Sequence, residues 1–173
     1  MFSPFIFGFH FNNLLERKHV LVRGPRTFDG SLLVLEEQKD VGKLSLMKFK
    51  YVKFWLQIYN VPLMCMTRDI GLFLSKQINI MRDIDVGALR DYIGKYIRVR
   101  VGVEIDKPLK RYLKTNIGEP NNVVVMLLRY KRLLEYYFWC GFVGHSFLEC
   151  LHESNQTMEE RSKQFRFEAW MRA

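Results

Sequence analysis

The stretch Tyr96-Ile97-Arg98-Val99-Arg100-Val101-Gly102-Val103-Glu104-Ile105 shows the clearest alternation of apolar and polar side chains in the chain. The apolar set is Val99, Val101, Val103 and Ile105, and the set between them is Arg98, Arg100, Gly102 and Glu104. Because successive side chains of a strand point to opposite faces of a sheet, this pattern predicts a β-strand with one buried face and one polar face. The sequence on either side is expected to supply the other strands of that sheet.

The segment from Phe54 to Val61 alternates in the same way and predicts a second strand, which ends at Pro62. The side chains expected in the core are Phe54, Leu56 and Ile58, and those expected on the other face are Trp55, Gln57 and Tyr59. A helix is predicted after the N-cap residue Thr67, and its apolar stripe is Ile70, Phe73, Leu74 and Ile78. Further strands are predicted at 78–84 and 123–130, with a short basic turn from Lys107 to Lys114 between them.

The first residues predict a strand, a helix and a second strand. Aromatic residues recur at every second position from Phe5 to Phe11, which is typical of a strand. Asn13 is an expected N-cap with Glu16 three residues later, and Gly24-Pro25 ends the helix. A turn at 28–30 leads into a strand at 31–37.

These elements indicate an α+β fold, built from small strand-helix-strand units with a largely antiparallel sheet. A degenerate zinc-knuckle hairpin and a charged C-terminal tail are expected to follow. The predicted boundaries are 1–43 for a partial α+β domain, 44–133 for a second α+β unit, 134–151 for the knuckle and 152–173 for the tail.

The predicted knuckle rests on the spacing Cys140-x4-His145-x4-Cys150, with glycines at 141 and 144. A zinc knuckle has the pattern Cys-x2-Cys-x4-His-x4-Cys, in which glycines let a short loop turn around a tetrahedral ion. Tyr137 stands at the position of the first cysteine. Three interpretations are open: zinc held by three ligands, a fourth nitrogen from His152 at the cost of loop strain, or free thiols in a collapsed aromatic hairpin.

Composition restricts the class of protein. The chain has 173 residues and a net charge of +9, with a pI near 9.6, and such a basic surface attracts polyanions, nucleic acid first. Its 3 cysteines are an odd number, which indicates a reducing, intracellular compartment; nucleus and cytoplasm are not distinguished. We expect no membrane span, because no apolar run reaches about 18 residues. We expect no secretory leader, because the apolar N-terminus has neither a basic leader nor a small-residue cleavage site.

The basic and aromatic residues suggest how nucleic acid would bind. If one face of the sheet is open, Trp55 and Tyr59 would lie beside Arg98 and Arg100, and flat rings beside guanidinium groups suit single strands. The alternative is a sheet covered by the first unit or by the tail. The other predicted nucleic-acid contacts are Lys107, Lys110, Arg111, Lys131 and Arg132 for phosphates, Tyr136, Trp139 and Phe142 for bases, and Arg129.

Several segments together resemble a family of plant retrotransposon-derived proteins, in which a conserved domain of unknown function precedes a CCHC-type zinc knuckle. They are residues 24–35, 54–63, 65–67, 70–71, 98–101, 107–109, 129–133, 140–141, 144–146 and 170–173, in collinear order. Arg26 replaces the usual aromatic residue, Tyr137 replaces the first knuckle cysteine, and the family's domain begins with a further strand, helix and strand. The resemblance implies nucleic-acid binding, as in the RNA-binding proteins that such elements encode.

The function predicted from the sequence is therefore binding of single-stranded RNA or DNA, mostly without sequence specificity, with zinc as the cofactor that the knuckle implies. The alternative is a self-associating homo-oligomeric fragment, or a decayed retroelement product that has lost binding. We expect neither an enzyme nor a small-molecule substrate, because the sequence has no catalytic motif or carboxylate cluster at useful spacing.

Overall fold

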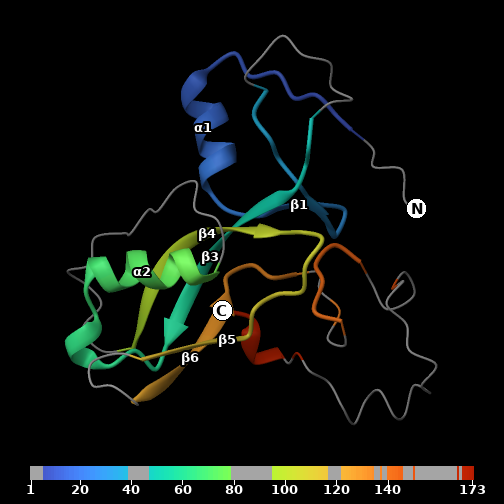
Figure 1. Cartoon of the computed structure of the whole chain (residues 1–173). Helices are drawn as coiled ribbons and strands as arrows, with labels where there is room; N and C mark the ends of the chain where they lie inside the picture. Colours follow the sequence, from blue (N-terminus) through green and yellow to red (C-terminus); the bar gives the residue numbers. More distant parts are fainter. Residues whose placement is uncertain are drawn as a thin grey trace.

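The computed structural model describes residues 6–38, 47–78, 95–116, 122–134, 137, 140–145, 150, 167 and 169–173. Over the described residues the fold is α+β, with the helices α1 and α2 and antiparallel sheets, arranged as in Figure 1. The predicted fold class is therefore confirmed. Among the described residues, no helix is both long enough and apolar enough to span a membrane.

A four-stranded sheet forms the centre of the molecule. Its strands are β3 (Tyr51–Tyr59), β4 (Tyr96–Glu104), β5 (Tyr112–Asn116) and β6 (Val123–Tyr130), in the order β4-β3-β6-β5. All neighbouring strands are antiparallel, and β3 pairs with β4 along its full length, from Tyr51↔Glu104 to Tyr59↔Tyr96. The alternation of β3 and β4 suits both strands to this sheet, because each offers one apolar face to the core.

Helix α2 (Arg68–Ile78) covers the apolar face of this sheet (Figure 1). The Thr67 hydroxyl accepts a hydrogen bond from the Ile70 amide (3.3 Å), which confirms the predicted N-cap. Leu74 and Ile78 are buried against the sheet, but Phe73 is 47% exposed, so the predicted stripe is wrong at that position. Gly71 takes the inward position instead, because the helix passes so close to the sheet that a Cβ there would lie 3.2 Å from the Ile97 side chain.

The core joins the sheet to α2 and to the C-terminal residues. Its fully buried side chains include Phe54, Leu56, Ile58, Leu74, Ile97, Val99, Val101, Met126, Leu128, Tyr130, Leu133 and Met171. The short helix η5 (Ala169–Met171) brings Met171 under β6, and the Ala173 amide donates to the Tyr130 carbonyl (3.0 Å). The end of the predicted charged tail is thus part of the core.

The N-terminal unit contains α1 (Leu14–Val22) and a hairpin of β1 (Arg26–Phe28) and β2 (Ser31–Leu33). The Asn13 side chain accepts from the Leu15 amide (2.8 Å), so the predicted cap is confirmed. Helix α1 has no buried residue, in contrast to α2.

Several predicted elements need correction. Residues 6–11 form no strand, so the strand predicted there is wrong. The strand predicted at 31–37 ends at Leu33, and the chain segment predicted as a basic turn contains the start of β5. The strand predicted at 78–84 lies outside the described residues apart from Ile78, which belongs to α2. A 3-10 turn, η2 (Leu63–Cys65), follows Pro62 and brings the partly buried Cys65 against the core.

Candidate nucleic-acid interface and metal cluster

The second face of the sheet carries rows of aromatic and basic side chains. In one row, the register places Gln57 of β3 between Arg98 of β4 and Arg129 of β6. In the next row, Tyr59 lies between Tyr96 and Leu127, and Leu127 is paired with Tyr112 of β5. We call this surface the open face and define it by Trp55, Gln57, Tyr59, Tyr96, Arg98 and Arg129, all of which are partly exposed.

Guanidinium groups on the open face lie over aromatic rings. The Arg98 guanidinium carbon is 4.0 Å from the centroid of the Trp55 ring, and that of Arg129 is 4.6 Å from the Tyr59 ring. The Tyr59 and Tyr96 rings are 5.2 Å apart with an interplanar angle of 44°, and the Tyr59 hydroxyl donates to the Gln57 amide oxygen (3.0 Å). These contacts hold long side chains in fixed positions, which lowers the entropic cost of using them to bind a ligand.

The N-terminal unit covers one end of this face. The Arg100 side chain donates to the Leu21 carbonyl at the end of α1 (2.7 Å), and Arg100 is only 3% exposed. Gly24 lies against Trp55, because a Cβ added at Gly24 would be 3.6 Å from the Trp55 ring. Arg100 therefore anchors the N-terminal unit in this structure, although the sequence predicted it as a nucleic-acid contact. At the end of the face near Trp55, the sheet is thus covered by the N-terminal unit, which was the alternative to an open face.

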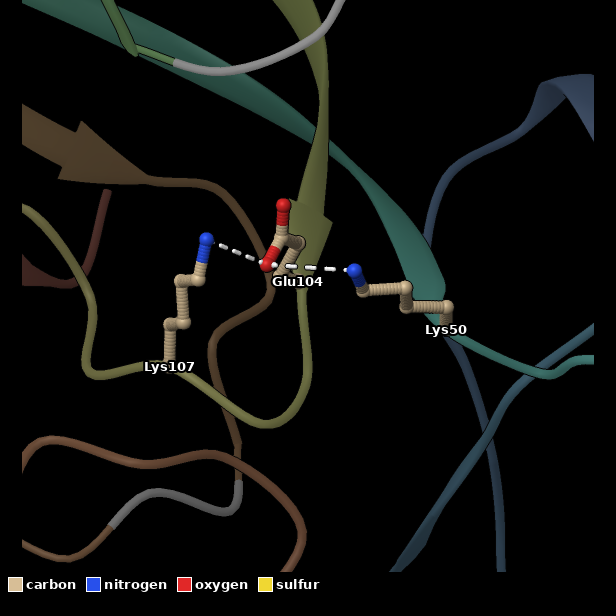
Figure 2. Close-up of polar contacts among 3 residues, drawn as sticks. All are labelled: Lys50, Glu104 and Lys107. Atoms are coloured by element: carbon tan, nitrogen blue, oxygen red, sulfur yellow. Dashed lines mark ion pairs between the residues drawn. The ribbon is translucent and has the colours of Figure 1, made fainter.

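The segment between β4 and β5 is basic, but its lysines are partly engaged. Lys107 lies 2.7 Å and Lys50 lies 3.7 Å from the same carboxylate oxygen of Glu104 (Figure 2). The hydrogen bond from Lys107 lowers the pKa of the Glu104 carboxyl, and the same pair raises the pKa of Lys107. Lys110 donates to the Gln77 carbonyl at the end of α2.

Beside this segment lies a shallow basic hollow. Its volume is about 450 Å³, and its lining is Gln77, Lys110, Arg111, Tyr112, Leu113 and Lys114. Arg111 and Lys114 both lie over the Tyr112 ring, at 5.5 Å and 5.4 Å from its centroid. Tyr112 and Lys114 were not among the predicted nucleic-acid contacts, because a five-residue strand offers too short an alternation to be recognised.

The remaining predicted nucleic-acid residues fall into two groups. Lys131 and Arg132 are exposed in the turn after β6, where Arg132 has a positive φ of 59°. Phe142 is partly buried in the predicted knuckle, and Tyr136 and Trp139 lie outside the described residues. The structure therefore brings Trp55, Tyr59, Arg98 and Arg129 together. It places Lys131 in the turn directly after β6, where the Lys131 amide donates to the Trp55 carbonyl (2.8 Å).

The predicted knuckle residues form a compact cluster. The ligand atoms of Cys140, His145 and Cys150 all lie within 4.8 Å of one another, and the Cys140 sulfur is 3.2 Å from Nε2 of His145. Burial raises the pKa of the Cys140 thiol to about 11. Zinc bonds of about 2.3 Å to sulfur and 2.0 Å to nitrogen separate tetrahedral donors by roughly 3.5–3.8 Å, so the three donors fit one metal ion.

The backbone of this cluster forms the tight turn that the glycines predicted. Gly141 and Gly144 have φ values of 73° and 81°, a region that favours glycine. Tyr137 is buried, and its carbonyl accepts from the Gly141 amide (2.8 Å). Its ring lies edge-on to His145, with centroids 6.3 Å apart. Tyrosine thus replaces the first cysteine and keeps the turn, while His152, the other predicted nitrogen donor, lies outside the described residues.

Comparisons of the chain with protein-family models, with curated proteins and with solved structures find no match.

Proposed function

We propose that this protein binds single-stranded nucleic acid, RNA or DNA, on the open face of its four-stranded sheet and with little sequence preference. The observation that carries the proposal is the pair of stacked guanidinium groups, Arg98 on Trp55 and Arg129 on Tyr59. Aromatic rings can stack on bases of any sequence, and the neighbouring guanidinium groups can neutralise the phosphates between them.

The charge of the whole chain supports the same ligand. A net charge of +9 attracts a polyanion over a long range, and the exposed cations of the basic hollow and of the turn after β6 extend the positive surface. Sequence-independent binding of this kind has a Kd of roughly 10⁻⁴–10⁻⁶ M at physiological salt. The partner is therefore nucleic acid rather than a small molecule, and we propose no catalytic role.

The test is fluorescence anisotropy of a labelled single-stranded RNA, titrated with protein at several salt concentrations. The variant Arg98→Ala/Arg129→Ala should bind more weakly, and its plot of log K against log salt should be shallower by about 1.4, since each lost contact with a single strand removes about 0.7. The matched control is Arg68→Ala/Lys76→Ala, which removes the same charge from two exposed positions on α2, the helix that covers the opposite face of the sheet. Equal losses of RNA affinity in both variants would contradict the proposal and show that only the net charge attracts the RNA.

We further propose that Cys140, His145 and Cys150 bind zinc. Two thiolates and an imidazole are the donors that zinc prefers, and the fourth ligand of a tetrahedral ion would come from water or from the bound ligand. Zinc would fix the turn against the sheet, so it would add to the stability of the folded protein.

Cobalt(II) is a suitable probe for this site, because its thiolate absorption bands report sulfur ligands directly. Wild-type protein should give these bands, and Cys140→Ser should lose most of their intensity. Tyr137→Cys restores the complete knuckle pattern and should tighten zinc binding by at least about tenfold, since a fourth protein ligand completes the tetrahedron. An unchanged zinc affinity in Tyr137→Cys would show that a side chain at position 137 does not reach the ion.

The resemblance to plant retrotransposon-derived proteins is likewise a proposal, which rests on the collinear residues and agrees with a nucleic-acid ligand. We place the protein inside the cell on the same basis, together with its free cysteines.

A second candidate function is self-association. Its support is the apolar surface of the N-terminal unit, where Phe7, Phe9, Leu14, Leu15 and Phe28 are each more than 60% exposed. Light scattering over a range of protein concentrations tests it, and a constant monomer mass would remove it.

A further inference from the structure

Phe167 lies in a slot between the predicted knuckle and the segment before β5. Its ring packs on the backbone of Gly141 so closely that an added Cβ at Gly141 would lie 2.1 Å from Cζ of Phe167. On another side, the Arg111 guanidinium carbon is 5.5 Å from the centroid of the ring. Phe167 is only 7% exposed, so a planar ring fills the space between a guanidinium group and a bare stretch of backbone.

The two walls of this slot are held independently of Phe167. The Leu109 amide donates to the Gly141 carbonyl (2.8 Å), which ties the knuckle turn to the chain before β5. The Arg111 carbonyl accepts from the Leu128 amide (2.9 Å), which ties the other wall to β6. A slot with fixed walls can persist when its occupant leaves.

The C-terminal residues also have anchors of their own beyond Phe167. Met171 is fully buried, Arg172 pairs with Tyr130, and the Arg172 guanidinium donates to the Leu134 carbonyl (3.1 Å). Phe167 precedes this anchored stretch, so the contacts of Met171 and Arg172 do not depend on the Phe167 ring.

The surroundings of the slot are basic. Arg111 is shared between the slot and the basic hollow, which contains Lys110 and Lys114 as well. A ring bound against Gly141 and Arg111 would thus have cations beside it for an attached phosphate. A planar aromatic group linked to a phosphate is the chemical description of a nucleotide, and guanidinium groups stack well on nucleobases.

We propose that the Gly141–Arg111 slot is a nucleobase-binding site, which the Phe167 side chain fills in the free protein and a base of a single strand fills in the complex. The Phe167 ring and the base compete for the slot. The apparent affinity for nucleic acid is therefore reduced in proportion to the fraction of molecules in which the slot is empty of Phe167. This inference takes its ligand class from the proposed function, but it concerns a different surface from the open face.

The first test uses Phe167→Ala in the full chain and measures the thermal midpoint Tm with small probes. Uridine 5′-monophosphate at millimolar concentration should raise the Tm of this variant by about 2–5 °C and leave wild-type protein nearly unchanged, because the vacated slot admits the base. Ribose 5-phosphate, which has the phosphate but no base, should give no shift. An equal shift with ribose 5-phosphate, or with toluene, would overturn the proposal in favour of plain charge binding or a plain apolar cavity.

The second test uses RNA affinity. Phe167→Ala should bind a single-stranded RNA about three- to tenfold more tightly than wild type, and should bind an abasic strand of equal charge no more tightly. Phe167→Leu, which keeps the apolar packing but lacks a ring, serves if the alanine variant does not fold, and it should show a smaller gain of the same sign. A loss of RNA affinity in both variants would show that Phe167 only supports the fold.

The two proposals fail in different ways. If wild-type protein binds RNA but Phe167→Ala does not respond to uridine 5′-monophosphate, the slot proposal is wrong and the open-face proposal stands. If Arg98→Ala/Arg129→Ala has no effect on RNA binding while the Phe167→Ala response is present, the open-face proposal is wrong and the slot remains.

Discussion

The two faces of β3 have opposite characters over the same nine residues. On one face, Phe54, Leu56 and Ile58 are at most 1% exposed and pack in the core beneath α2. On the other, Trp55, Gln57 and Tyr59 are partly exposed and carry the guanidinium groups of neighbouring strands. One strand therefore serves stability with one set of side chains and presents a binding surface with the other.

The contrast between the two faces explains how the open face accommodates exposed aromatic residues. Large aromatic rings exposed to water cost free energy, but guanidinium groups that stack on them cover part of their apolar area. The core face needs no such partners, because tight packing of aliphatic groups excludes water from it. The two faces should therefore respond differently to the same kind of substitution.

The largest effect is expected on the core face. Leu56→Ala should lower the free energy of unfolding by about 2–5 kcal/mol, because it leaves a cavity where Leu56 is 0% exposed. Gln57→Ala on the next position should lower it by less than about 1 kcal/mol, since it loses one partly exposed hydrogen bond. Urea unfolding followed by circular dichroism measures both, and similar losses would contradict the division of β3 into two faces.

On the open face, the expected effect is on binding instead. Tyr59→Ala should weaken single-stranded RNA binding by about 1–3 kcal/mol, or roughly five- to 150-fold, which is the usual contribution of one stacked base. Its unfolding free energy should change far less than that of Leu56→Ala. Tyr51→Ala is the matched control, because Tyr51 lies on the same face of β3 at its opposite end. If anisotropy titrations give equal losses for both tyrosines, the stacked rows around Tyr59 do not define the site.

The smallest effect concerns Glu104, a buried acid at the edge of β4. Lys107 lowers the pKa of its carboxyl below the ordinary 4.5, so this pair stabilises the folded state above that pH and the contribution is lost as pH falls through the lowered value. Glu104→Gln should have a lower Tm than wild type at pH 7, and the difference should shrink towards pH 3. A difference that stays constant over this range would show that packing, and not charge, makes Glu104 important.

The sequence predicted the elements whose signals are local. Alternation located β3 and β4 and assigned their faces correctly, and the caps at Asn13 and Thr67 were recognised because each side chain bonds within its own helix start. The spacing of Cys140, His145 and Cys150 predicted their cluster, since a loop of this length brings its ends together. The strand predicted before Asn13 is wrong, because alternation of side chains does not specify a neighbouring strand, and a strand needs one for its hydrogen bonds.

What the sequence determined by itself is therefore the identity of the two faces of β3 and β4, the turn around the cysteines and the overall basic charge. Tertiary structure alone decided which side chains meet across strands: Arg129 over Tyr59, Arg100 against the end of α1, and Phe167 on Gly141. These contacts join residues far apart in the chain, and strand order and register fix them. A pattern that repeats every two residues specifies which face a side chain lies on, but not which neighbour it finds there.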